Sequence, residues 1–160
     1  MKTATKFWMI LMAAVLTIGL VSCSDPEEGE DWDTWIMRNM LDSGWSLDQV
    51  KVNGNYKSMG EPGFDFYFYM DLKANGRKFD AKRFFYKDYE KDDATEVLKS
   101  GTFTIVEKNK AIEATDSDGK KFFRLESIEF GTGSMTATIT FYDLNQTYDV
   151  ILSRSATIKN

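Results

Sequence analysis

The side chains that most often do chemistry in proteins are scarce in this chain. Its 160 residues contain no histidine and a single cysteine, Cys23. Without histidine, the chain lacks the commonest acid–base group at neutral pH and the commonest transition-metal ligand. A single cysteine excludes an intramolecular disulfide and a thiolate metal cluster. Because a serine or cysteine nucleophile would lack its usual base, we expect a protein that is not an enzyme and carries no cofactor.

The acidic run Asp-Ser-Asp-Gly at residues 116–119 has the composition of a calcium loop. In an EF-hand, Asp118 would be the fifth position, and Ala114 and Leu125 would be the first and twelfth. Neither of these two side chains can bind calcium. Asp and Gly also suit the backbone angles of a hairpin turn. We therefore expect a turn here, with no metal site.

Residues 1–22 have the pattern of a bacterial export signal. Lys2 and Lys6 precede an unbroken apolar run of 15 residues, Phe7–Val21. As a helix this run spans about 22 Å, which is short of the roughly 30 Å hydrocarbon core of a bilayer. It therefore fits a cleaved signal better than a permanent span. Loss of the two lysines would change the formal net charge from −5 to −7, which disfavours nucleic acid as a partner.

The end of this signal, Leu20-Val21-Ser22-Cys23, resembles the lipobox of bacterial lipoproteins. The resemblance implies cleavage before Cys23 and attachment of acyl chains, such as palmitate, to Cys23 as the new N-terminus. Two or more chains hold a protein stably on a membrane, because each buried CH₂ contributes about 0.8 kcal/mol. The alternative is an ordinary signal followed by an incidental cysteine.

Residues 23–31 are acidic and contain proline and glycine. Such a stretch cannot bury apolar area, and we expect a solvated tether. It resembles the acidic export signal of Bacteroidetes lipoproteins, which implies an outer-membrane lipoprotein that faces outward from the cell. A plain spacer, with the protein on the periplasmic face, is the alternative.

Residues 32–160 form one expected domain, which starts with a helix at Asp31–Leu41. Trp32, Trp35, Ile36 and Met40 recur at the three-to-four-residue spacing of one helix face, and Asp31 or Asp33 can cap the start. Such a stripe usually packs against the rest of a domain.

Eight segments after the helix show the alternation and turn signals of strands. No gap between them is long enough for a helical crossover, so neighbours should be antiparallel. Changes of phase near Gln49 and Ser127 predict bulges. The segments are Gly44–Val52, Phe64–Lys73, Arg77–Lys87, Glu96–Glu107, Lys110–Thr115, Lys120–Phe130, Ser134–Asp143 and Gln146–Arg154, with a charged loop at Asp88–Thr95.

This succession predicts an all-β fold, an eight-stranded antiparallel up-and-down barrel that leaves no exposed sheet edge. A two-sheet β-sandwich is the alternative.

Three of the segments resemble strands of the lipocalin-like family. Leu41–Leu47 resembles its first strand, which contains glycine and tryptophan, Lys99–Ile105 its Gly-x-Tyr/Phe mid-barrel strand, and Tyr148–Arg154 its closing strand. The resemblance implies that Trp45 plugs the closed end of the barrel. It also implies that Arg154 packs across the Trp45 indole in a cation–π contact.

Two surfaces of the expected barrel could bind a partner. One is the interior, which could hold a small hydrophobic ligand or be filled by its own side chains. The other is an outer face with Tyr67 and Tyr69 between Asp65 and Asp71, where exposed tyrosines could contact a protein or a glycan. The candidates to line the interior are Phe66, Phe68, Phe103, Ile105, Ile139 and Phe141.

These observations lead to a lipid-anchored binding or accessory protein of the cell envelope, of the lipocalin-like type, with a small apolar ligand in the barrel. The alternative is a non-enzymatic interaction module with a filled core, which contacts a protein or glycan through its outer aromatic face.

Overall fold

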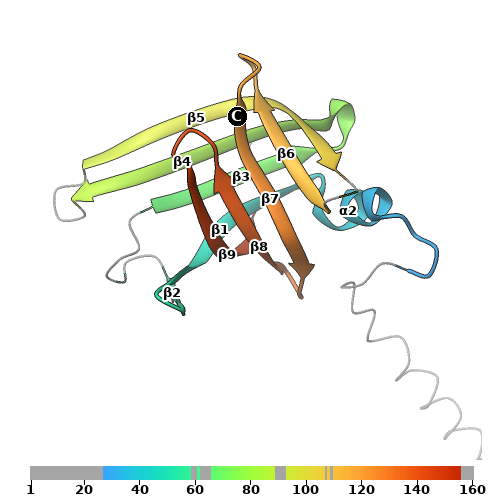
Figure 1. The fold of residues 1–160 in the computed structure, drawn as a ribbon, viewed down its shortest axis with the longest axis horizontal. Helices are drawn as coiled ribbons and strands as arrows, with labels where there is room; N and C mark the ends of the chain where they lie inside the picture. Colours follow the sequence, from blue (N-terminus) through green and yellow to red (C-terminus); the bar gives the residue numbers. More distant parts are fainter. Residues whose placement is uncertain are drawn as a thin grey trace, which may run out of the picture.

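The structure, a computed structural model, describes residues 27–58, 61, 66–88, 93–106, 108 and 110–155. In these ranges, one α-helix is followed by nine strands and a short 3₁₀ turn (Figure 1). The elements are α2 (Trp32–Met40), β1 (Ser43–Val52), β2 (Asn55–Ser58), β3 (Phe66–Lys73), η1 (Asn75–Arg77), β4 (Lys78–Asp88), β5 (Asp93–Val106), β6 (Ala111–Asp116), β7 (Lys121–Phe130), β8 (Ser134–Phe141) and β9 (Gln146–Ser155). None of the helices in the described ranges has the length and apolarity that crossing a membrane requires.

Helix α2 begins at the residue that caps it. Asp31 Oδ1 accepts a hydrogen bond from the Thr34 N–H (2.8 Å), one of the first-turn donors that have no partner within the helix. The spacing of Trp35, Ile36 and Met40 places all three in the core. The helix predicted before the first strand is confirmed, and it lies against one end of the barrel (Figure 1).

The strands close into a barrel. Strands β1, β3 and β4 to β9 pair in chain order, every ladder is antiparallel, and β9 returns to pair with β1. The predicted eight-stranded up-and-down barrel is confirmed. Because one ladder joins the first strand to the last, the two-sheet sandwich is excluded.

The ninth strand was not predicted. Asn53 and Gly54 have positive φ angles of 52° and 83°, the conformation of a tight hairpin turn. This turn folds β2 back on β1, where Val52 pairs with Asn55. Since β2 has only four residues, it carries too few side chains to show an alternating pattern.

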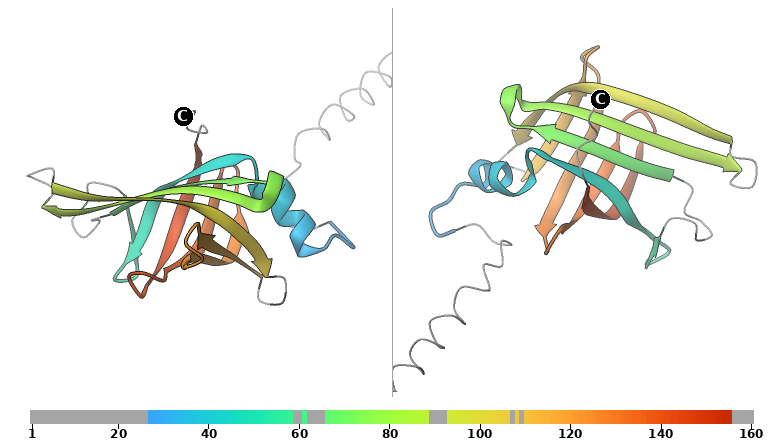
Figure 2. Two further views of the ribbon diagram at one scale, coloured as in Figure 1. Left: turned by 90° about the horizontal axis from the view of Figure 1, so that it is seen from above. Right: turned by 180° about the vertical axis from the view of Figure 1, so that it is seen from behind.

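The charged loop predicted at residues 88–95 is also shorter than expected. Strand β4 runs to Asp88 and β5 begins at Asp93, and these two residues form the last pair of the hairpin. Backbone hydrogen bonds do not depend on side-chain polarity, so the ladder continues through charged residues. The hairpin reaches past the other strands at the end of the barrel opposite α2 (Figure 2).

Both predicted bulges are present. The register between β1 and β9 shifts between Leu47 and Gln49, and the register between β7 and β8 shifts between Glu126 and Glu129. Ser127 lies within the second shift and has a φ of 53°. Because a bulge increases local twist and bends its strand, the two bulges help this sheet to curve into a barrel.

Strand β5 changes partner at Gly101. Its first part pairs with β4 alone, and from Gly101 onward it pairs with β6. A Cβ atom at Gly101 would lie 2.1 Å from the carbonyl oxygen of Thr115, so only glycine permits this approach. Among the described residues, β5 before Gly101 therefore has a ladder on one side only and is an edge strand there.

Candidate functional site

The barrel interior is packed with aromatic rings. Phe68 lies between Phe123 and Phe141, with ring centroids 5.5 and 5.1 Å away, and Phe79 meets Phe123 edge-on at 5.4 Å. Rings at these distances and tilts are in direct contact. These contacts favour a filled core over an open cavity. The structure buries five of the six predicted lining residues and half-buries Ile105; the five are Phe66, Phe68, Phe103, Ile139 and Phe141.

At the closed end, Trp45 and Arg154 lie opposite each other on β1 and β9. The Arg154 guanidinium carbon is 5.4 Å from the centre of the Trp45 ring. Trp45 Nε1 donates a hydrogen bond to the Met40 carbonyl (3.0 Å), and Arg154 Nη2 donates one to the Asn39 carbonyl (2.7 Å). Carbonyls in the last turn of a helix have no partner within it. Trp45 and Arg154 therefore also supply hydrogen-bond donors to two carbonyls at the C-terminal end of α2.

The opposite end of the barrel contains an arginine that sequence analysis did not single out. The Arg83 side chain is only 2% exposed. Its guanidinium carbon lies 4.7 to 5.2 Å from the ring centres of Phe85, Phe122 and Phe141. Arg83 Nη1 donates to Asp143 Oδ1 (2.9 Å), Nη2 donates to Oδ2, and these hydrogen bonds lower the pKa of Asp143. The buried Arg83 Nε–H has no hydrogen-bond partner among the described residues.

A signal for Arg83 was present in the sequence. Phe79, Ala81 and Arg83 alternate along β4, and Phe79 and Ala81 are buried in the core. In an extended strand, side chains two residues apart share a face. The alternation therefore places Arg83 inside the barrel.

The outer tyrosine face differs from the prediction. Tyr69 and Asp71 are 6% and 4% exposed, and Tyr67 is half-buried. The expectation of an exposed tyrosine at position 69 is wrong because Gly44, on the neighbouring strand, has no side chain. A Cβ atom on Gly44 would lie 2.6 Å from the Tyr69 hydroxyl, so the ring occupies the space that Gly44 leaves. Asp65, which was expected to flank the tyrosines, lies outside the described residues.

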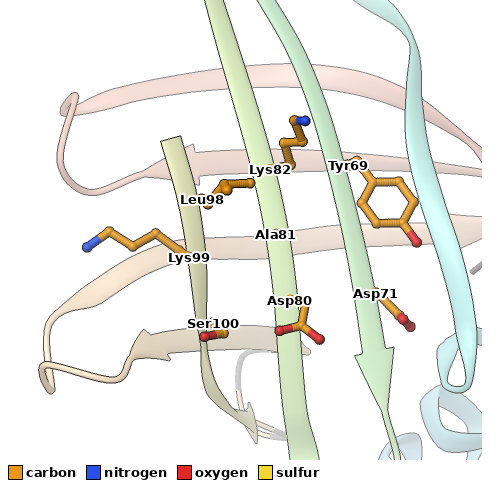
Figure 3. Close-up of a pocket in the computed structure, with 8 residues that line it drawn as sticks. All are labelled: Tyr69, Asp71, Asp80, Ala81, Lys82, Leu98, Lys99 and Ser100. Atoms are coloured by element: carbon orange, nitrogen blue, oxygen red, sulfur yellow. The ribbon is translucent and has the colours of Figure 1, made fainter. Parts of the chain in front are cut away.

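A groove of about 350 Å³ lies on this outer face, over β3, β4 and β5 (Figure 3). Lys82, at one end of it, forms an ion pair with Glu96 (3.3 Å). Leu98 is 64% exposed and supplies apolar surface, whereas the Lys99 side chain extends away from the other labelled residues. The groove is lined by Tyr69, Asp71, Asp80, Ala81, Lys82, Leu98, Lys99 and Ser100.

The two carboxylates that line the groove differ in their partners among the described residues. Asp80 is held by Lys73, with Oδ2 2.5 Å from Nζ. Among the described residues, Asp71 has no such ion-pair partner, and its carboxylate accepts no hydrogen bond. Burial raises the pKa of Asp71, and the nearby carboxylates of Asp80 and Asp42 raise it further, against the opposing effect of Lys73.

In the acidic turn between β6 and β7, the carboxylate of Asp116 accepts hydrogen bonds from the backbone of the turn itself. Asp116 Oδ1 accepts hydrogen bonds from the backbone N–H groups of Asp118 (3.0 Å) and Lys120 (2.9 Å). Asp116 Oδ2 accepts one from Lys99 Nζ (2.8 Å), and Gly119 has a φ of 76°. The hydrogen bond from Lys99 is the main cause of a lowered pKa at Asp116. In the part of the chain that the structure describes, no group of three or more acidic, cysteine or histidine side chains is placed to hold a metal ion.

Several sequence predictions concern residues outside the described ranges. These are the signal at residues 1–22, Cys23 and the first part of the tether, together with residues 156–160 of the expected domain. The last part of the tether lies against α2, where Glu27 and Glu30 form ion pairs with Arg38 (2.8 and 2.9 Å).

Together, the structure defines a closed up-and-down barrel of the kind found in lipocalin-like proteins, with a helix at one end, an aromatic interior and a groove on its outer face. Compared with known proteins, the chain matches no family model, and no curated protein or solved structure is significantly similar to it.

Proposed function

We propose that this chain is a lipid-anchored binding or accessory protein of the cell envelope whose partner docks on the outer groove. The observation that carries this proposal is the contrast between interior and surface. Phe68, Phe123 and Phe141 meet inside the barrel, whereas a groove of about 350 Å³ is open on the outside. That volume is at the lower end of the range of ligand sites.

The sequence supports the other parts of the proposal. The lipobox ending at Cys23 supports a lipid anchor, and the acidic tether supports an outer-membrane position that faces outward. A chain without histidine, whose only thiol is acylated, is poorly equipped for catalysis. We therefore assign it a binding role without a cofactor.

Native mass spectrometry of the full-length protein, purified from the host membrane, tests both the anchor and the site. We expect a mass that includes acyl chains, lost in Cys23→Ala, and no additional non-covalent lipid in the barrel. The variant Phe68→Ala provides a positive control, since removal of a buried ring leaves a cavity that can take an apolar molecule. A stoichiometric apolar ligand in the unaltered protein would place the binding site inside the barrel and refute the outer-groove proposal.

A further inference from the structure

The charges around the groove do not balance. The carboxylates of Asp80 and Asp42 lie close enough to Asp71 to disfavour its charge, and among the described residues Lys73 opposes them. Lys73 is engaged by Asp80, and Asp42 Oδ1 accepts a hydrogen bond from the Ala74 N–H (3.2 Å). Asp71 alone of the three lacks a hydrogen-bond donor among the described residues.

Burial makes the lack of a donor energetically costly for Asp71. Asp71 is 4% exposed, and it lines the groove over β3–β5. A carboxylate this buried has lost most of its hydration, and what contact with water it keeps is through the groove. A ligand that brings a charged donor would supply what the protein does not.

We propose that the groove binds the ammonium or guanidinium group of a lysine or arginine side chain from a protein partner, with Asp71 as its anionic anchor. This inference rests on the proposed function and names the chemistry of the partner. Charge-assisted hydrogen bonds between such a group and a carboxylate are about twice as strong as neutral ones.

The geometry disfavours the other kinds of occupant. An anion would face Asp71 and Asp80 at close range. A metal ion needs several oxygen ligands at once, and no three acidic side chains of the described ranges are arranged to provide them. A neutral sugar could donate hydrogen bonds to Asp71 but would leave its charge uncompensated.

The rim of the groove indicates a protein rather than a small free amine. Leu98 is 64% exposed beside the groove, on the part of β5 that has a ladder on one side only. A side chain carried on a polypeptide brings neighbouring groups that can cover Leu98 and pair with the open edge. A free amine would neither cover Leu98 nor pair with the edge of β5.

The test uses isotope-labelled full-length protein in detergent micelles, with chemical-shift titration of the tripeptide acetyl-Leu-Lys-Leu-amide. We expect saturable shifts at residues of the groove. Replacement of lysine by the uncharged norleucine in the peptide, or Asp71→Asn in the protein, should weaken binding about tenfold or more. The matched control is Asp118→Asn, which removes the same charge from the exposed turn between β6 and β7 and should leave the affinity unchanged.

Two further readouts separate an anchor from a structural residue. Binding should weaken as the pH falls through the raised pKa of Asp71, because protonation removes the negative charge that the cation needs. The Tm of Asp71→Asn without peptide should equal or exceed that of the unaltered protein, since the substitution removes a desolvated, unpartnered charge. A clear fall in Tm would make Asp71 structural and overturn the inference.

The remaining outcomes also decide the question. Equal binding of the norleucine peptide would show that apolar contact alone is recognised, and equal binding of cadaverine would overturn the assignment to a protein partner. If the groove binds the lysine peptide with the same affinity in Asp71→Asn, this inference fails while the proposed function survives. If an apolar ligand fills the barrel instead, the proposed function fails first.

Discussion

At each end of the barrel an arginine packs against aromatic rings, but one of these arginines is exposed and the other is buried. At the closed end, Arg154 is an exposed residue that lies over one face of Trp45 and reaches the carbonyl of Asn39. At the other end, the side chain of Arg83 is 2% exposed and forms an ion pair with Asp143. The first arginine keeps its hydration, whereas the second has lost nearly all of it.

Both arginines join parts of the chain that are far apart in sequence. Arg154 is 115 residues from Asn39, and Arg83 is 60 residues from Asp143. The two contacts differ in what their loss would cost in stability, because a buried charge is destabilising unless its partner is present and well placed. The comparison therefore predicts that the closed end depends on the tryptophan and much less on its arginine, whereas the other end depends on an intact ion pair.

Trp45→Ala should have the largest effect. The Trp45 side chain is 1% exposed and fills the closed end, so its loss leaves a large cavity and removes the donor to Met40. We expect the free energy of unfolding to fall by about 3–5 kcal/mol, measured by denaturant titration. Trp45→Phe, which keeps part of the volume, should lose less. A loss below about 1 kcal/mol for Trp45→Ala would show that Trp45 does not plug the barrel, since exposed sites typically cost no more than that.

Asp143→Ala should have the next largest effect, because it leaves Arg83 buried without a carboxylate. Removing one partner of a fully buried pair costs about 3–5 kcal/mol. The Asp143 side chain is 42% exposed and solvent reduces this cost, so we expect about 2 kcal/mol. The double variant Arg83→Met/Asp143→Ala should recover most of the loss, since it also removes the buried charge. If the double variant is no more stable than Asp143→Ala, the buried charge is not the cause.

The contribution of this ion pair should vanish at low pH. The pKa of Asp143 in the folded protein is lowered by Arg83, below the value of about 3.9 in the unfolded chain. A lowered pKa gives stability that is complete above the unfolded value and is lost as the pH falls through the folded one. The difference in stability between the unaltered protein and Asp143→Ala should therefore be constant near pH 7 and shrink below about pH 4. A difference that does not shrink at all as the pH falls below about 4 would have to come from packing.

Local patterns in the sequence predicted most of the fold. The helix cap, at Asp31 of the two candidate aspartates, and the bulges near Gln49 and Ser127 depend on short-range backbone preferences, and they are present where expected. Closure of the barrel is different, because alternation along a strand is the same in a barrel and in a sandwich. The ladder between β1 and β9 resolves that choice.

The candidate site was harder to predict because it depends on neighbours across strands. Tyr69 and Asp71 have the alternation of outward residues but are buried. For Tyr69 the cause is the absence of a side chain at Gly44, which lies on the neighbouring strand. The groove combines side chains of β3, β4 and β5, whose registers cannot be read from one strand alone. Arg83, by contrast, was visible in the alternation of its own strand.

Arg154→Met should have the smallest effect of the three substitutions at the two ends. Methionine keeps most of the apolar stem over Trp45 but removes the cation–π contact and the donor to the Asn39 carbonyl. An exposed cation–π contact is worth about 0.5–1 kcal/mol, and water can replace the lost donor at an exposed position. We expect the free energy of unfolding to fall by about 1 kcal/mol in denaturant titration. The stability of Arg154→Lys should lie between that of the unaltered protein and that of Arg154→Met, because lysine keeps the charge but lacks the planar guanidinium group. A loss as large as that of Asp143→Ala would mean that both ends depend equally on their arginines, and the contrast between a hydrated and a buried charge would no longer explain this barrel.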